Sequence, residues 1–502
     1  MLTRVATKSG SKKPYRSEQL QGVGNFFNSL SYAAMTQSWA EEMTLEKLEE
    51  KTVKYFSERM NSEPNIYWEG FFEQIFQGTD IEISPTTVVS LPFDKVMQVL
   101  QSVKYADTKA VANALNFQLA TQLLLESTGV LDDLNTFKCT ESNLPKEVLC
   151  LEKTKEYFGY SLGTTYLNVY YNDAVTTPAI TSLMDKIKQG YQDVIDDTKW
   201  MENKTKAYLK DKIQDMTTFI TKPDWLKENG GLENFYQGLQ VANNMRSSYP
   251  MNFLRVNNWY VAKTRSYTNR ITKIQESGDL SDFHIYDLSM SRYLGTVQAQ
   301  FHPMINEARI EGGIVQKPLF GANRPGFMNF GGLGMVLAHE VGHSFDTKGR
   351  NYDKNGKSGE FWDPVSVKNY NDWVQTLASD AGSVAYQTSE TSAETIDPYK
   401  TLNEDIADVL AVYISYFSYQ EYLKELEANG KHEKVLPGLK TFEPQKLFFM
   451  KYANMWCDKK DTQSMYADMQ SIHSAGNTRA TLPLKRSKQF AEAFGCKIPK
   501  QY

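Results

Sequence analysis

The chain has 502 residues, of which 41% are hydrophobic and 23% charged, and its formal net charge is −5. This composition is ordinary for a soluble globular protein, and the length exceeds the usual size of a single hydrophobic core, so we expect two lobes. The sequence contains no basic block, finger-type cysteine spacing or base-stacking motif, which argues against nucleic acid as a partner.

Neither an export signal nor a membrane segment is visible in the sequence. Residues 1–18 carry scattered Lys and Arg but lack the run of about seven to fifteen apolar residues that a signal peptide needs. The longest uncharged apolar run, 409–420, is too short to cross a bilayer about 30 Å thick as a helix. We therefore predict no membrane-spanning helix in this chain.

Residues 1–220 are predicted to form a helical lobe. Apolar residues recur at spacings of three and four in a series of segments: 45–60, 91–103, 108–125, 151–171 and 180–220. Two groups of helix breakers follow, Lys222-Pro223-Asp224 and Asn229-Gly230-Gly231. They are the best candidates for a boundary between lobes, so we place the second lobe at 221–502.

The second lobe is predicted to combine a small sheet with further helices. After a helical stretch at 232–274 and a loop at 279–287, short strands are expected at 296–301 and 308–310. Residues 318–334 contain seven glycines and prolines and are expected to form a long loop. Three more helical patterns follow, at 402–422, 443–456 and 490–494. The predicted fold is therefore mainly α and two-lobed.

The strongest local signal is His339-Glu340-Val341-Gly342-His343, which lies directly after the glycine-rich stretch. Two histidines four positions apart on a helix lie on one face, so their imidazoles can converge on a single metal ion. Glu340 points far enough around the helix to miss the metal but to reach a water bound to it. This HExxH pattern predicts two zinc ligands and a general base.

A catalytic zinc needs a third protein ligand and one open position for water. The metzincin pattern would place a histidine six residues after His343, where Gly349 stands, so that class is excluded. Glu404 and Asp408 lie four apart on a predicted helix and share one face. Glu404 could bind the metal, and Asp408 could accept the free N–H of a ligand histidine. A site without any third ligand is the alternative that these residues leave open.

The chain resembles the neprilysin and endothelin-converting-enzyme family of zinc metallopeptidases. The resemblance rests first on GMVLAHEVGHSFD at 334–346, TLNEDIAD at 401–408 and HSAGNTR at 473–479. Four smaller blocks support it in the family's order and spacing: 349–351, 436–439, 455–457 and 490–496. A weaker likeness covers residues 44–120. Together these blocks are highly specific for the family.

This resemblance implies a zinc endopeptidase that cleaves peptides on the amino side of large hydrophobic residues. Three residues of the matching blocks would hold one zinc ion: His339, His343 and Glu404. Glu340 would be the general base, Asp408 would orient a histidine, His473 would stabilise the oxyanion, and Arg479 would grip a substrate carbonyl. The second lobe would have a thermolysin-like core, a small sheet beside the two ligand-bearing helices, and the helical lobe would cover the active site and restrict it to peptides.

One departure from the family pattern concerns substrate binding. The family's Asn-Ala-x-aromatic motif reads Gln298-Ala299-Gln300-Phe301 here. Gln298 keeps the side-chain amide but lengthens its arm by one methylene. Gln298 and Ala299 are the predicted substrate contacts, and the change favours a rival hypothesis, a catalytically impaired homologue that acts as a binding or decoy protein.

The cysteines and the chain ends bear on the compartment. Cys139, Cys150, Cys457 and Cys496 could form two disulfides in an oxidising compartment or remain thiols. In the family, the partners of the last three lie in an amino-terminal region with a membrane anchor that this sequence does not show. The resemblance implies disulfide bonding and an extracellular or cell-surface location, for either a truncated product or a member without the anchor.

Overall fold

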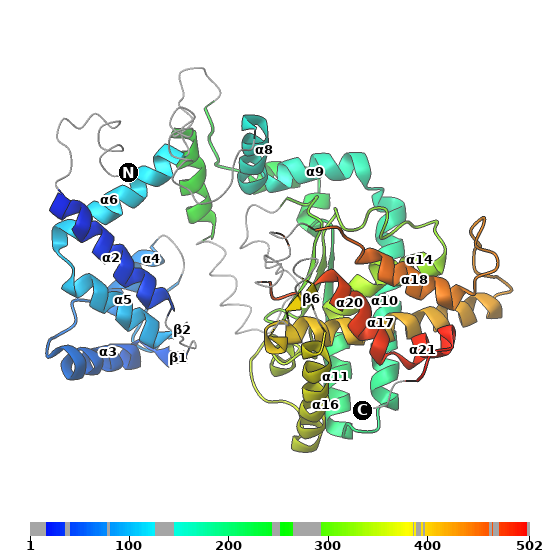
Figure 1. The fold of residues 1–502 in the computed structure, drawn as a ribbon. Coiled ribbons are helices and arrows are strands. Elements are labelled where there is room, and N and C mark those ends of the chain that lie inside the picture. The colour runs from blue at the N-terminus through cyan, green and yellow to red at the C-terminus, as the bar shows by residue number, and fades with distance from the viewer. Residues whose placement is uncertain are drawn as a thin grey trace. The chain divides into compact units, whose positions relative to one another are not determined.

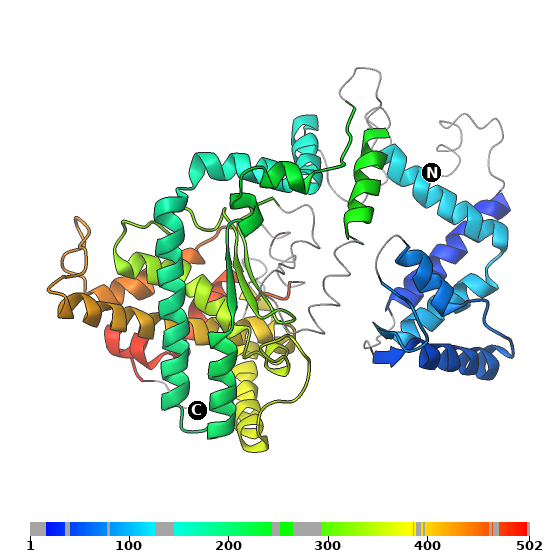
Figure 2. The same ribbon diagram turned by 180° about the vertical axis from the view of Figure 1, so that it is seen from behind.

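The computed structural model describes residues 17–35, 41–77, 81–125, 145–242, 251–264, 293–384, 386–387, 393–394, 397–460, 464 and 471–498. The chain divides into two compact units (Figures 1 and 2). Unit 1 comprises Met1–Leu151 and Tyr236–Lys273, and unit 2 comprises Glu152–Phe235 and Ile274–Tyr502. Helices dominate both units, which confirms the predicted mainly α, two-lobed fold.

Unit 1 is a small helical unit with a two-stranded hairpin. Its labelled elements are α2 (Ser17–Met35), β1 (Glu41–Thr44), α3 (Leu45–Met60), α4 (Trp68–Ile75), β2 (Val88–Leu91), α5 (Phe93–Tyr105), α6 (Thr108–Leu125) and the start of α8 (Lys146–Tyr157). The helix α3 begins where predicted because the side chain of Thr44 accepts the N–H of Lys47. The indole of Trp68 donates to the buried hydroxyl of Thr52 at 2.9 Å, so the core of this unit contains a satisfied polar pair.

Unit 2 carries most of the chain and a three-stranded sheet. Its first elements are α9 (Gly159–Tyr170), α10 (Asp173–Asp197), α11 (Asn203–Gln214), β3 (Thr217–Ile220), η2 (Asp224–Lys227), α12 (Gly231–Phe235), β4 (Ala299–His302) and β5 (Glu307–Ile310). The others are α14 (Gly326–Asn329), η4 (Phe330–Gly334), α15 (Met335–Gly342), η5 (Gly349–Asn351), α16 (Pro364–Gly382), β6 (Tyr386–Gln387), β7 (Ala393–Glu394), α17 (Pro398–Ala428), α18 (Pro444–Met455), α20 (Gly476–Arg486) and α21 (Lys488–Phe494).

The sheet has the strand order β3-β5-β4. The strand β4 pairs with β5 in antiparallel register, with Ala299 opposite Ile310, which confirms strands near the two predicted positions. The strand β3 pairs with β5 in parallel. Ala308 and Ile310 of β5 are fully buried in the main core with the apolar residues of α15. The sheet therefore supports the helix that carries the HExxH pattern.

The border between the units differs from the sequence-based boundary at 220/221. The contacts place one border between Leu151 and Glu152, inside α8, so α9, α10, α11 and β3 belong to the same unit as the HExxH helix. The reason is tertiary: α10 packs against α15 and α17, and β3 completes the sheet. The breakers at 222–224 and 229–231 lie within unit 2 around η2 and α12.

Three local predictions need correction. Residues 217–220 form the strand β3, not the end of a helix. The helix predicted at 151–171 is interrupted at Phe158, between α8 and α9. The predicted loop at 318–334 becomes helical from Gly326 onward, where α14 and one turn of π-helix, η4, run into α15. The loop predicted at 279–287 lies outside the described residues.

The glycines of η4 serve close packing, not chain reversal. A Cβ atom at Gly332 would lie 2.3 Å from the carbonyl oxygen of Leu319, and one at Gly331 would lie 2.7 Å from that of Phe448. These residues let other backbone segments approach the start of the HExxH helix. The glycines at 331–334 therefore indicate close packing of a helix, and the prediction of a loop from them was wrong.

The described part of the chain gives no support to the implied disulfide bonds. Cys457 and Cys496 are exposed free thiols, so disulfide bonds are not supported at these two positions. Cys150 is also exposed, and Cys139 lies outside the described residues. Within the described part of the chain, no helix combines the length and hydropathy needed to cross a membrane.

Candidate metal centre

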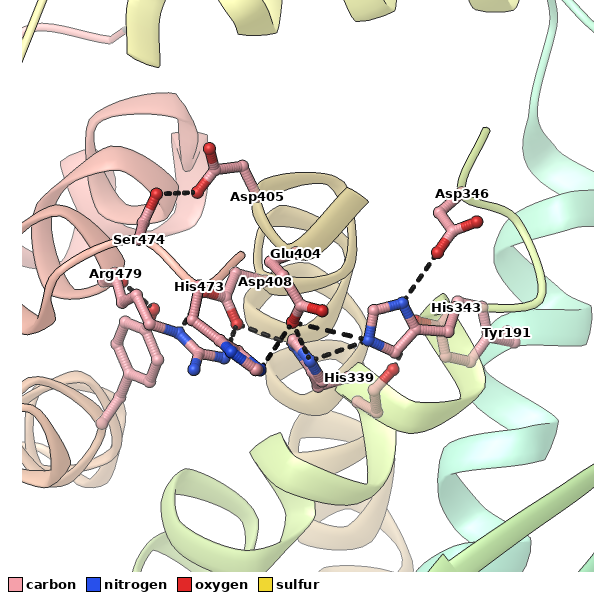
Figure 3. A network of polar contacts seen from close by, with 12 residues as sticks. Tyr191, His339, His343, Asp346, Glu404, Asp405, Asp408, His473, Ser474 and Arg479 are labelled. Atoms are coloured by element: carbon pink, nitrogen blue, oxygen red, sulfur yellow. Dashed lines mark hydrogen bonds and ion pairs between the residues drawn. The ribbon is translucent and has the colours of Figure 1, made fainter. Parts of the chain in front are cut away.

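The site is built where α15 and α17 cross. At the crossing, a Cβ atom on Gly342 would lie 3.2 Å from Cα of Ala407, so the two backbones approach closely. The hydroxyl of Tyr191, in α10, donates to the carbonyl oxygen of Ala338 at 2.7 Å and anchors α15 from another side. The close crossing brings side chains of both helices to one point (Figure 3).

His339, His343 and Glu404 meet at that point, as the sequence predicted. The two Nε2 atoms are 3.1 Å apart, and Oε2 of Glu404 lies 3.2 Å from His339 Nε2 and 3.6 Å from His343 Nε2. Donor atoms about 2.0–2.2 Å from a tetrahedral zinc ion are separated by roughly 3.3–3.6 Å, so the observed distances are within about 0.2 Å of those around such an ion. Within the described residues, these three form a group that could hold a metal.

Each histidine is held by a carboxylate through its other ring nitrogen. Nδ1 of His339 donates to Asp408 Oδ1, and Nδ1 of His343 donates to Asp346 Oδ2, both at 2.8 Å. These bonds fix the tautomer and leave both Nε2 atoms available for a metal. Asp408 was predicted in this role. Asp346 was missed, although its position three residues after His343 is a spacing that could have indicated it.

Charge around the ligands favours ionised carboxylates and proton-bearing imidazoles. Burial lowers the pKa of His343, but its bonds to Asp346 and Glu404 outweigh burial and raise that pKa to about 10. Burial opposes ionisation of Glu404, yet the two imidazoles outweigh it and hold its pKa far below the usual value. A cation is therefore electrostatically favoured at this point, and a metal ion would take the place of the ring protons.

Arg479 donates to the same carboxylate, Asp408, that accepts a hydrogen bond from His339. Its Nε donates to Asp408 Oδ2 and its Nη2 to Asp408 Oδ1, both at 2.7 Å, and its guanidinium carbon lies 4.0 Å from the ring centroid of Trp456. Burial raises the pKa of Asp408, but Arg479 and His339 outweigh burial and bring it down to about 2. The structure thus brings Arg479 to the site through the carboxylate that orients His339.

Glu340 and His473 also lie at the centre. Glu340 is buried beside His339 in α15, and burial raises the pKa of its carboxyl group. Nε2 of His473 is 3.3 Å from Glu404 Oε2, and its half-exposed side chain has a pKa lowered by burial. The neighbouring Ser474 donates to Asp405 of α17 at 2.7 Å, a link that holds the His473 segment in place and that the sequence did not reveal.

The two predicted substrate contacts lie at the sheet. Ala299 begins β4, which is at one edge of the described three-stranded sheet and packs against α15. The carbonyl oxygen of Gln298 accepts the N–H of Glu311 at 3.1 Å, so Gln298 extends the pairing of β4 with β5 by one residue. Both are therefore placed beside the HExxH helix, and their role in substrate binding remains a prediction.

The turn after His343 leaves no room for a side chain at position 349. A Cβ atom on Gly349 would lie 1.8 Å from the carbonyl oxygen of His343. Gly349→Ala should force this turn open and lower the free energy of unfolding by about 1–3 kcal/mol or more, as measured by chemical denaturation. Gly24→Ala is the control, because nothing lies within 4 Å of a Cβ atom there. Equal stability of Gly349→Ala and the parent chain would contradict this packing.

Together, the fold and the site define a metallopeptidase-type centre, an HExxH helix facing a second helix that supplies a glutamate. The chain belongs to peptidase family M13: two models of this family match residues 298–501 and 1–223. This result confirms the resemblance to neprilysin and endothelin-converting enzymes. The site shown by the geometry and the family found by comparison thus agree.

The individual relatives have low sequence identity to this chain, but the matches cover most of its length. The chain is 26% identical to human "Membrane metallo-endopeptidase-like 1" over 86% of this chain and 53% of that protein. It is 26% identical to mouse "Neprilysin" over 91% of this chain and 58% of that protein. Inhibitor-bound zinc metalloprotease Zmp1 of Mycobacterium tuberculosis has a similar fold, with a TM-score of 0.69 at 15% identity over 99% of this chain and 71% of that one. The chain thus spans little more than half the length of these curated relatives.

Proposed function

We propose that this protein is a zinc-dependent metalloendopeptidase that cleaves peptides on the amino side of large hydrophobic residues. The observation that carries the proposal is the convergence of His339 Nε2, His343 Nε2 and Glu404 Oε2 within 3.6 Å of one another. Each histidine is already oriented by a carboxylate, as zinc-ligating histidines usually are. Family membership supports zinc as the metal and peptides as the substrate class.

The chain's own residues can perform the proton transfers of peptide hydrolysis. Zinc bound at this site would supply Lewis acidity and lower the pKa of a water ligand from about 15.7 towards 7. Glu340 would accept a proton from the attacking water and deliver it to the leaving amine, a role that its burial-raised pKa favours. His473, whose Nε2 lies 3.3 Å from Glu404 Oε2, would donate towards the carbonyl oxygen as negative charge grows there.

Arg479 has two proposed functions. It holds Asp408 and through it the ring of His339. In the role implied by the family, its fork of donors would also bind a substrate carbonyl. Gln298 and Ala299, at the start of the adjacent strand β4, would bind the substrate backbone. Relatives named as membrane endopeptidases support an extracellular or cell-surface location.

A mixture of synthetic peptides tests the proposed specificity. We expect cleavage before Phe, Leu, Ile and similar residues, identified by mass spectrometry of the products, and we expect a strong chelator to abolish it. Added zinc should restore the same cleavage pattern. Peptides cut at other positions, or cleavage that persists in chelator, would contradict the proposal.

A catalytically impaired binding protein is the second candidate. It is favoured by Gln298, which replaces the family's asparagine in the substrate-binding motif. In that case the protein would bind zinc and peptides without hydrolysing them. Gln298→Asn distinguishes the two, because restored hydrolysis in that variant alone would identify the longer side chain as the cause of impairment.

A further inference from the structure

Lys212, in α11, is a fully buried lysine next to the turn that follows the HExxH helix. Its relative exposure is 0%. Its Nζ donates to the carbonyl oxygens of Gly349 at 2.7 Å and of Ser344 at 3.3 Å. These carbonyls lie near the two ends of the turn 343–349, which begins with His343. The ammonium group of Lys212, which belongs to neither ligand-bearing helix, therefore bonds to both ends of this turn.

The same turn orients the imidazole of His343. One oxygen of Asp346 accepts the Nδ1–H of His343 at 2.8 Å, and the other accepts the amides of Lys348 at 2.8 Å and Gly349 at 2.6 Å. The carboxylate thus bonds to the ring and to the turn at once. Any opening of the turn would move Asp346 and with it the direction of His343 Nε2.

The charge of Lys212 suits this position. A buried ammonium group is costly unless it is hydrogen-bonded and near opposite charge. Burial lowers the pKa of Lys212 to about 8, while Asp346 and Asp353 act in the opposite direction, so the group remains mainly protonated at neutral pH. Its two carbonyl partners lie just beyond the carboxyl end of α15, where the helix dipole also favours a cation.

The backbone of Lys212 is itself fixed to the sheet. The side-chain amide of Asn306 donates to the carbonyl oxygen of Lys212 at 2.8 Å, and the carbonyl oxygen of Asn306 accepts the N–H of Thr217 at 3.0 Å. Nζ of Lys212 lies 5.9 Å from the ring centroid of Phe301 in β4. The backbone that carries the ammonium group is therefore held by contacts outside the turn 343–349.

We propose that Lys212 is a positioning residue for the zinc ligand His343. Its ammonium group keeps the turn 343–349 closed, so that Asp346 remains bonded to the imidazole and Nε2 of His343 remains directed at the metal. The inference rests on the zinc site of the proposed function. It adds a residue of α11 that belongs to none of the ligand-bearing segments.

Zinc affinity of the full chain tests this role without using catalysis. Lys212→Met keeps the length of the side chain but removes its charge and donors, and we expect zinc to bind about 10- to 100-fold more weakly in competition with a chromophoric chelator. Lys212→Arg should recover part of the affinity. In the metal-free protein, backbone amides at 344–349 should exchange faster in Lys212→Met than in the parent chain.

Lys188→Met is the matched control. Lys188 is a half-buried lysine of α10 that also donates to a backbone carbonyl, that of Met216, but does not contact the turn. The zinc affinity of Lys188→Met should equal that of the parent chain. Unchanged zinc affinity in folded Lys212→Met, even with a lower melting temperature, would overturn the inference. If that variant does not fold, unchanged affinity in Lys212→Gln would overturn it equally. Failure of the parent chain to bind zinc would instead refute the proposed function.

Discussion

Replacing Glu340 with Gln should lower the rate of peptide hydrolysis by about 10²- to 10⁴-fold and leave zinc binding unchanged. The amide has nearly the shape of the carboxylate but cannot accept the proton of the attacking water. Because Glu340 is buried in α15 and is not one of the three converging donors, its neutralisation should not remove the metal. Initial rates on a hydrophobic peptide, together with metal analysis of the same sample, provide the measurement.

Glu425→Gln is a suitable control for this substitution. Glu425 lies on the ligand-bearing helix α17 but is exposed there and pairs with Lys186. This variant should retain the parent rate. Equal rates for Glu340→Gln and Glu425→Gln would show that Glu340 is not the general base, whatever the metal content.

Replacing Asp408 with Ala should have the largest effect on stability. Asp408 is buried and bonds to both His339 and Arg479, so its removal leaves a largely buried guanidinium without its carboxylate. Breaking such a pair on one side costs about 3–5 kcal/mol. Loss of the bond to His339 should also weaken zinc binding about 10- to 100-fold. Denaturant unfolding of the metal-free chain measures the first effect, and chelator competition measures the second.

A graded variant separates geometry from charge at this position. Asp408→Asn keeps an acceptor for His339 but lacks the charge that pairs with Arg479, so its stability should fall between those of the parent chain and Asp408→Ala. A free energy of unfolding for Asp408→Ala within about 0.5 kcal/mol of the parent value, as for an ordinary surface substitution, would contradict the role of this pair.

The centre of the site could be predicted because its signals are local. His339, Glu340 and His343 follow from spacing on one helix. Glu404 and Asp408 share one face of another helix, which made them candidates, and the family resemblance then implied their roles. What sequence spacing cannot give is the partner of a side chain. Arg479 was assigned to substrate, whereas the structure shows its guanidinium bonded to Asp408. Lys212 carries no local signal at all, because its partners Ser344 and Gly349 lie 132 and 137 residues away.

The fold shows the same division between local and tertiary information. The helices α3 and α6 lie at the residues where apolar spacings of three and four predicted them, and α17 extends beyond the predicted 402–422 at both ends. The four-residue strand β3 has no such pattern and exists because it pairs with β5, far along the chain. The border inside α8 likewise reflects which helices pack together, and no composition change marks it.

The most direct test of the zinc-peptidase proposal is a titration of the metal-free chain with zinc while peptide hydrolysis is followed. We predict that the rate rises in proportion to added zinc and reaches a plateau at one ion per chain, and that Glu404→Ala, which lacks one of the three converging donors, shows no such rise. Hydrolysis that does not depend on zinc, or a chain that binds one zinc and cleaves no peptide, would contradict the proposal.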